Sequence, residues 1–186
     1  GILGSDFRIV DTLGVRAVTV KTNLVNTLNP GNNDRVITYQ VTFPDSGTYD
    51  LYARILVGKN TFDDDSYFYA NGFGTKNATT NADWIRANGL AVIGYTNTLD
   101  VVAGYGTASN GIWKWINMSK YTGDSPPITF RVEQGSLSQT FQIGARENGL
   151  YIDKLVFGRK GLYFTVYNLN RGEAGSELPP GEVPLN

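Results

Sequence analysis

The feature that most constrains this chain is a pair of alternating segments, residues 140–146 and 150–157, around a short Arg-Glu-Asn-Gly turn. Apolar side chains fall on every second residue of each segment, which is the spacing of a β-strand with one buried face. Two such strands joined by a glycine-containing turn predict a β-hairpin. Asp153 lies inside the second strand, on the predicted face of Leu155 and Phe157, where a carboxylate needs a cation, an arginine or backbone donors.

The same alternation recurs along the chain, with turn residues such as Pro, Asp, Ser and Gly between the segments. No segment has a convincing helical period, although residues 82–88 are compatible with one helical turn and residues 162–167 with an extra strand. We therefore expect an all-β protein, an antiparallel two-sheet β-sandwich of jelly-roll type. The other predicted strands are residues 15–21, 36–43, 48–57, 66–70, 111–117 and 128–133.

The composition indicates one domain and excludes several classes of function. The chain has 186 residues, a formal net charge of −1, and neither cysteine nor histidine. Without them it has no disulfide framework, no thiolate nucleophile and no Ser-His-Asp triad. The charge balance argues against a nucleic-acid or anionic membrane partner, and no apolar run is long enough to span a bilayer. We expect a sandwich over residues 1–170 and a Pro-, Gly- and Glu-rich linker over residues 171–186.

Several aromatic residues are candidates for a binding surface. Trp113 and Trp115 lie two residues apart, so in a strand their rings share one face. Either ring packs in the core, or the rings offer a flat surface for the C–H face of a sugar. Loop aromatics are further candidates, because a loop buries few large side chains. The predicted stacking residues are Trp84, Tyr95, Tyr105 and Trp113.

Three consecutive carboxylates at residues 63–65 precede a predicted strand. They repel one another unless a cation or an arginine compensates, so they form either a solvated acidic turn or a loop of oxygen ligands for calcium. A glycosidase would need two carboxylates about 5–10 Å apart in a cleft. The sequence marks no such pair, and we expect a protein that is not an enzyme.

With these residues in view, four segments resemble in order the strand motifs of the family 6/35-like carbohydrate-binding modules of polysaccharide-degrading enzymes. They are Gly-Thr-Tyr-Asp-Leu-Tyr-Ala-Arg at 47–54, Asp-Ser-Tyr-Phe-Tyr at 65–69, Trp-Lys-Trp at 113–115 and the hairpin at 140–155. The resemblance implies a glycan site in the loops at one end of the sandwich. The loop after Val57, residues 94–111 and residues 146–150 would border it.

The resemblance also implies roles for individual residues. Asp153 matches an acidic position that binds structural calcium in many members, and it joins Asp64 and Asp65 as a metal candidate. The chain departs from the family at Tyr151, where many members have a sugar-binding Asn, and it lacks the usual Glu-Ala-Glu opening. The turn is expected to supply the polar sugar contacts instead, through Arg146, Glu147 and Asn148.

The function implied is non-catalytic binding of a plant or algal polysaccharide, with xylan or a related hemicellulose as the first candidate. The module would be a monomer, covalently linked to a glycoside hydrolase and located outside a bacterial-type cell or on its surface. The alternative is a structural domain that packs on a neighbouring catalytic domain without a ligand of its own. A large exposed apolar patch would favour this alternative.

Overall fold

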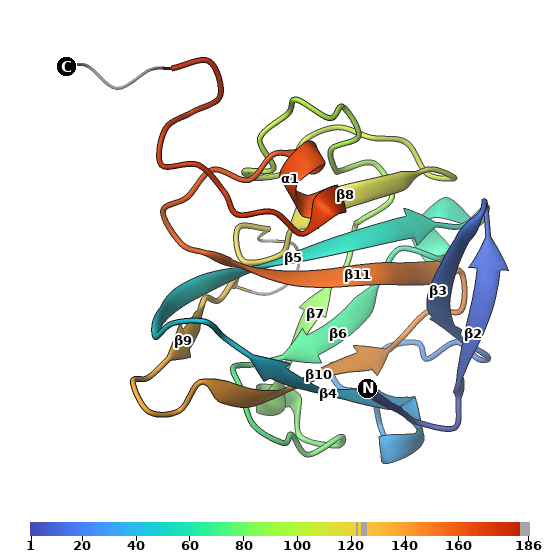
Figure 1. Ribbon diagram of the computed structural model, residues 1–186. Helices are drawn as coiled ribbons and strands as arrows, with labels where there is room; N and C mark the ends of the chain where they lie inside the picture. The colour runs from blue at the N-terminus through green and yellow to red at the C-terminus, as the bar shows by residue number, and fades with distance from the viewer. Residues whose placement is uncertain (122, 124–125, 183–186) are drawn as a thin grey trace.

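The computed structural model describes residues 1–121, 123 and 126–182, which form two antiparallel sheets stacked face to face (Figure 1). The five-stranded sheet has the order β1-β4-β10-β6-β7, and the six-stranded sheet has the order β2-β3-β11-β5-β8, with β9 added to β5. The chain passes repeatedly between the sheets, so the predicted all-β sandwich is confirmed. The strands are β1 (Ile2–Leu3), β2 (Phe7–Thr12), β3 (Val15–Val20), β4 (Val36–Thr42), β5 (Gly47–Val57), β6 (Tyr67–Ala70), β7 (Trp84–Ala87), β8 (Trp113–Asn117), β9 (Phe130–Val132), β10 (Ser138–Ala145) and β11 (Leu150–Arg159).

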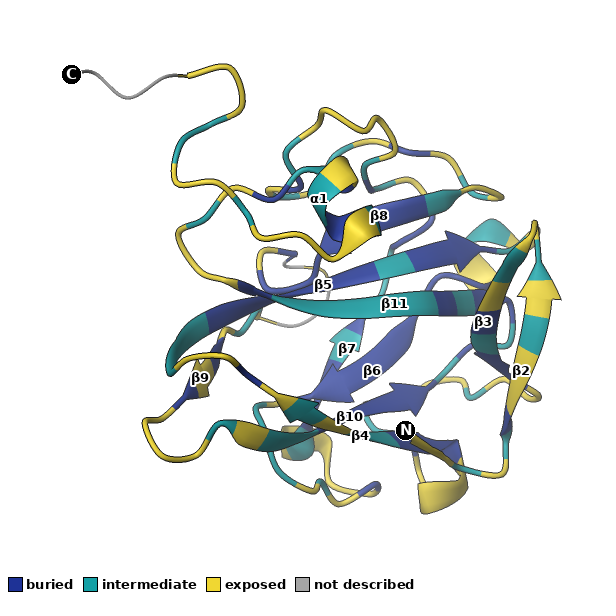
Figure 2. Cartoon of the chain, in the orientation of Figure 1, coloured by how far each residue is buried: buried dark blue, intermediate teal, exposed yellow. Residues whose placement is uncertain are grey.

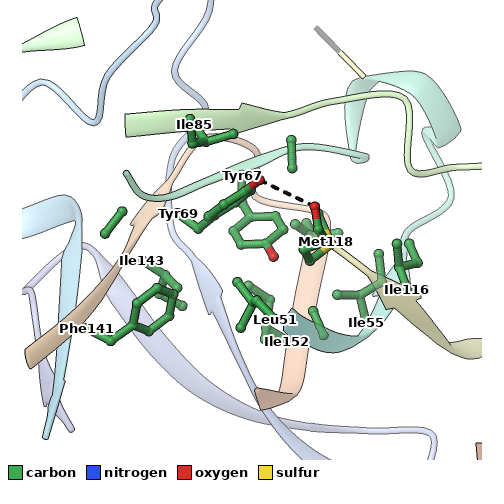
Figure 3. Close-up of a cluster of buried hydrophobic side chains, with 14 of the residues drawn as sticks. Leu51, Ile55, Tyr67, Tyr69, Ile85, Ile116, Met118, Phe141, Ile143 and Ile152 are labelled. Carbon is green, nitrogen blue, oxygen red and sulfur yellow. Dashed lines mark hydrogen bonds between the residues drawn. The ribbon is translucent and has the colours of Figure 1, made fainter. Parts of the chain in front are cut away.

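The core lies between the sheets and follows the alternation of the sequence. On β5, every second side chain from Tyr49 to Val57 is buried in this core, as predicted. Figure 3 shows Leu51 and Ile55 of β5 facing Tyr69 of the other sheet. Burying a side chain of this size stabilises the fold by about 1.5–3 kcal/mol.

The outer face of β5 is covered by a short helix, α1 (Val166–Arg171). Tyr52 packs there with Trp115, with Phe164 just before the helix, and with Val166 and Leu169 of the helix. The strand predicted at residues 162–167 is therefore wrong, because Tyr163 and Thr165 form only isolated bridges and the helix begins at Val166. The hydroxyl of Thr165 accepts from the backbone N–H of Asn168, and the Asn168 side chain accepts from the Thr165 N–H, which is a capping box that starts a helix.

Two further elements differ from the prediction. The helical turn predicted at residues 82–88 is present only at the start of this range, in the 3-10 turn η3 (Asn81–Asp83), and β7 occupies most of the rest as the edge strand beside β6. No strand is predicted at residues 7–12, yet they form β2, which pairs with β3 along its whole length. Tertiary pairing stabilises both segments.

A β-bulge at Asp153 changes which side chains face the core. Ile152 pairs with Ile55, and Lys154 pairs with Arg54, so the register shifts across Asp153. Ile152 and Leu155 both pack in the core although they are three residues apart. The alternation predicts that Asp153 shares the face of Leu155, and this prediction is wrong. Asp153 instead meets Arg54 on the outer side of the sheet.

Beyond α1 the chain leads away from the sheets (Figure 1). It first pairs back, since the backbone groups of Tyr163 and Ser176 exchange hydrogen bonds of 2.8 and 2.9 Å. The predicted linker thus contains an ordered contact within its first residues, and residues 183–186 lie outside the described part. The division at residue 170 stays a prediction. In the described part of the chain, no helix has the length and apolar character needed to cross a membrane.

Candidate functional site

Segments from distant parts of the chain meet at one end of the sandwich, where β5 ends and β8 and β11 begin. The N–H of Gly58 donates to the carbonyl of Gly149 at 2.9 Å, and the N–H of Gly111 donates to the carbonyl of Val57 at 2.8 Å. The side-chain amide of Asn110 donates to the carbonyl of Gly58 at 3.4 Å. The segments that the resemblance pointed to are thus in contact. We call this region the loop end, and it comprises residues 58–65, 88–95, 104–112 and 146–149.

Asp64 is held in a cradle of two glycines at the loop end. Its Oδ2 accepts a hydrogen bond from the N–H of Asn60 at 2.9 Å, and its buried Oδ1 has no partner among the described residues. A Cβ atom on Gly149 would lie 1.9 Å from Cγ of Asp64, and one on Gly58 would lie 2.5 Å from Oδ2. Both positions therefore require glycine for steric reasons. Asp64 anchors the loop after β5 and does not point into solvent.

Asp65 and Lys114 tie the middle loops to the sheets from inside. Asp65 accepts from the N–H groups of Gly89 and Ala91 at 3.3 and 3.1 Å, and burial raises the pKa of this carboxyl. Lys114 is 1% exposed and donates to the carbonyls of Ala91 and Ala108 at 2.7 and 3.2 Å. Burial lowers the pKa of Lys114 to about 8, while the charge of Asp65 raises it. The two groups hold the shape of the loop end.

The predicted sugar contacts Arg146 and Glu147 are mostly buried against each other. Arg146 also donates to the hydroxyl of Ser66 and, at 3.1 Å, to Oδ1 of Asn88. Asn148 differs, because only its backbone is engaged in the described part of the chain, and its side chain is half-buried. Of the three residues, Asn148 is the one whose side chain remains available to a ligand.

An aromatic and ionic patch lies beside the loop end on the outer face of the six-stranded sheet. The guanidinium of Arg54 lies 5.5 Å from the ring centre of the half-buried Trp113 and donates to the carboxylate of Asp153 at 2.7 Å. Leu56 pairs with Trp113 on one side and with Tyr151 on the other, so these side chains form one row across the sheet. We call Trp113, Arg54, Tyr151 and Asp153 the outer patch.

The other predicted stacking residues have different environments. Trp84 is 4% exposed in β7 and donates its indole N–H to a loop carbonyl at 2.9 Å, so it belongs to the core and offers no ring face to a ligand. Tyr95 forms a bridge with Trp115 and packs against the second core cluster under α1. Tyr105 is 46% exposed and meets the ring of Tyr121 edge-on at 5.6 Å. Tyr105 and Trp113 thus remain as candidates.

The metal candidates Asp64, Asp65 and Asp153 do not fit one calcium site. Asp65 is occupied by backbone N–H groups and Asp153 by Arg54, and the buried Oδ1 of Asp64 has no hydrogen-bond partner among the described residues. Within residues 1–121, 123 and 126–182, no group of three or more acidic, His or Cys side chains gathers in a way that could hold a metal ion. Calcium needs six to eight oxygen ligands, which this arrangement does not supply.

Sequence reasoning missed the two cations that organise this region, Lys114 and Arg54. A signal was present for Lys114, which stands alone between Ile112 and Ile116 on one face of a predicted strand. The reasoning that a lone carboxylate on an apolar face needs a partner applies equally to a lone lysine. Arg54 gave no such signal, because its partner Asp153 reaches it only through the bulge.

An apolar groove opens elsewhere, between β4 and β11, and has a cavity volume of about 780 Å³. Its walls include Tyr39 and Val41 of β4, Leu155 and Phe157 of β11, and Leu169 of α1. This volume is within the range of about 300–1,000 Å³ that is typical of ligand sites. We call it the inter-sheet groove. No sequence pattern pointed to it, because its residues alternate like those of any buried strand.

Compared with protein-family models, with curated proteins and with solved structures, the chain matches none of them. Its function is therefore inferred from the residues themselves. Three features are open to a partner: the loop end with Tyr105 and Asn148, the outer patch beside it, and the inter-sheet groove.

Proposed function

We propose that this chain is a non-catalytic carbohydrate-binding module that holds an attached glycoside hydrolase at a plant or algal polysaccharide. The observation that carries the proposal is the outer patch, where a half-buried indole ring stands beside an arginine–carboxylate pair at the edge of the loop end. Xylan or a related hemicellulose is the first ligand to test, on the resemblance of the strand motifs alone.

The chemistry of the patch suits a sugar ring. The C–H face of a pyranose packs on a flat aromatic surface, and its hydroxyls need planar polar partners in the ring plane. Trp113 supplies the aromatic surface, and Arg54 and Asp153 supply a donor and an acceptor that are already oriented by each other. Tyr151 extends the row, and Asn148 of the adjacent turn adds an amide. Such a shallow site binds weakly, and linkage to the enzyme raises the effective concentration.

The test is affinity electrophoresis of the whole chain through soluble xylan, mannan, β-glucan, pectin and galactan, each with calcium and with EDTA. Retardation by at least one polysaccharide is expected. Trp113→Ala should reduce the apparent affinity at least tenfold, because it removes the ring on which the sugar stacks. Tyr163→Ala is the matched control, since it removes an exposed aromatic beyond the opposite end of β11.

The outcomes separate binding from folding. Both variants are first compared with the parent chain by thermal unfolding, so that a destabilised protein is not mistaken for one that fails to bind. If no polysaccharide retards the parent chain, the proposal is wrong. If retardation survives Trp113→Ala, the glycan site lies elsewhere, and Tyr105→Ala at the loop end becomes the next variant to measure.

The alternative function, a structural domain that packs on a neighbouring domain, has one observation in its favour. The inter-sheet groove exposes apolar side chains of both sheets, and apolar surface of this kind is typical of an interface. A chain that binds no polysaccharide but forms a stable complex with the catalytic domain of its parent protein would support this alternative.

A further inference from the structure

Strand β11 has a free edge along the inter-sheet groove. It pairs with β5 over its whole length, but β3 meets it only at the pair of Val18 and Ile152 (Figure 1). The N–H of Lys160, just beyond β11, donates toward β5, so by alternation the backbone groups of Leu155 and Phe157 point to the opposite edge. Among the described residues, no strand or loop donates to these groups or accepts from them.

Strand β4 has a second free edge on the other side of the same groove. The carbonyl of Val36 accepts from the N–H of Gly4, so the even-numbered residues of β4 present their backbone groups to the edge occupied by β1. Strand β1 ends its pairing at Thr38. Beyond it, the outward backbone groups of Gln40 and Thr42 have no backbone partner in the described part of the chain.

The groove between these edges is apolar on both of its walls. Figure 2 shows the consequence for β11, which is only partly buried over most of its length, whereas the adjacent β5 is mostly buried. A strand lying along β11 would direct alternate side chains toward the core and toward the helix. The residues that it would meet are Tyr39, Val41, Leu155 and Phe157 on the core side, and Phe164 and Leu169 on the helix side.

We propose that the inter-sheet groove binds an extended apolar peptide segment of a partner polypeptide, which adds to β11 as a strand. A compact apolar molecule would fill the volume but would cover the outward N–H and C=O groups of Leu155 and Phe157 without pairing them, which is unfavourable. A strand pairs them and buries its side chains on both faces. The segment would be about six residues long, to match residues 154–159, and apolar at most positions.

The rim explains why the partner is recognised by shape and apolar character and not by charge. Arg16 and Arg159 line the groove together with Asp45, Asp153 and Glu173, so side chains of both signs border it. A segment with a strong net charge of either sign gains nothing from such a rim. Asp153 borders both this groove and the outer patch, but the apolar walls of the groove take no part in the patch, so the peptide site would remain if the chain bound no glycan.

The experiment selects segments from a phage-displayed library of random seven-residue peptides against the whole chain. The expected result is enrichment of sequences that are apolar at most positions. The enriched peptide is then synthesised in two further forms, each N-methylated on one alternating set of backbone amides. Methylation of the amides that pair with β11 should lower the affinity of the peptide at least tenfold. Methylation of the other set, which points away from β11, should change the affinity less than twofold.

Two variants of the protein locate the site. Val41→Arg places a charged side chain in the groove and should abolish binding of the selected peptide. Val92→Arg is the matched control, since it makes the same substitution at an exposed valine of the loop end, and it should bind normally. Thermal unfolding of both variants checks that they fold. If Val41→Arg does not fold, the methylated peptides still test the proposal with the parent chain.

Four results would overturn the proposal. The first is that the library enriches no segment. The second is that both methylated peptides bind with the same affinity as the parent peptide, and the third is that a folded Val41→Arg protein binds the peptide unchanged. The fourth is self-association of the chain in sedimentation experiments that Val41→Arg abolishes, because the occupant would then be a second copy.

Discussion

Lys114 is expected to make the protein more stable as the pH rises above neutrality. Burial lowers the pKa of Lys114 to about 8 in the folded chain, against an ordinary value of 10.5. Below pH 8 both states carry the proton, and the folded state bears the cost of burying the charge. Between pH 8 and 10.5 the folded state releases this proton while the unfolded state keeps it, so the free energy of unfolding increases with pH.

The size of the effect follows from the two pKa values. The free energy of unfolding increases by about 3 kcal/mol when the pH rises from below 8 to above 10.5. Between pH 7 and 9.5 the increase is about 2 kcal/mol. The lysine is fully buried, so solvent screening does not reduce this figure. It keeps its hydrogen bonds to Ala91 and Ala108 in either protonation state, since a neutral amine still donates.

The assay is urea unfolding at pH 7, 8, 9 and 9.5, followed by tryptophan fluorescence, for the parent chain and for Lys114→Met. Burial raises the pKa of Tyr67 and of Tyr69, which lowers stability as the unfolded tyrosines ionise near pH 10. That contribution is common to both proteins and cancels in their difference. The parent chain should gain about 2 kcal/mol relative to Lys114→Met between pH 7 and 9.5.

A stability difference that stays constant with pH would refute this reasoning, whatever its absolute size. Lys59→Met is the matched control for the loss of one positive charge, because Lys59 is exposed on the loop after β5. The m-values of the proteins must agree, since a change in m would mean that the substitution altered the denatured state.

Three other substitutions test the packing directly by urea unfolding. Gly149→Ala should lower the free energy of unfolding by about 3 kcal/mol, because its Cβ would overlap Asp64. A loss below about 1 kcal/mol would contradict the close packing of Gly149 against Asp64. Arg35→Met should cost about 3 kcal/mol, since it leaves Asp6 without its buried partner at 2.5 Å; an unchanged midpoint would show that the pair is dispensable. Trp84→Phe should cost about 1 kcal/mol for one lost hydrogen bond and leave polysaccharide retardation unchanged, and loss of retardation would return Trp84 to the site.

Much of the fold could be predicted because the strands bury one face. In β4, β5 and β10 an apolar side chain on every second residue reports which face is buried, and tight turns separate the segments. The short edge strand β7 and the helix α1 escaped prediction. A segment of four residues shows no clear period, and the β-branched and aromatic residues at 162–167 favour a strand until the capping box at Thr165 is recognised.

The candidate site was predicted less completely than the fold. The segments expected at the loop end are in contact, yet the side chains chosen from them divide between different roles. Trp84 is core, Arg146 and Glu147 are mostly buried in a pair, and Asn148 keeps its side chain available. Residue type indicates that a side chain can bind a sugar, but whether it reaches solvent depends on pairing between strands that are distant in the sequence, such as β5 with β8 and β6 with β10.

The sequence by itself determined the class of the fold, the chemistry that is excluded and the segments that border the loop end. The first two depend on local alternation, turn residues and the absence of cysteine and histidine, whereas the segments were indicated by the resemblance of the strand motifs. Only the tertiary structure decided that Asp153 pairs with Arg54, that Lys114 is buried, and that β4 and β11 keep free edges along a groove. The reason is physical: a bulge, a buried charge and an unpaired edge are relations between strands, and alternation within one strand does not encode them.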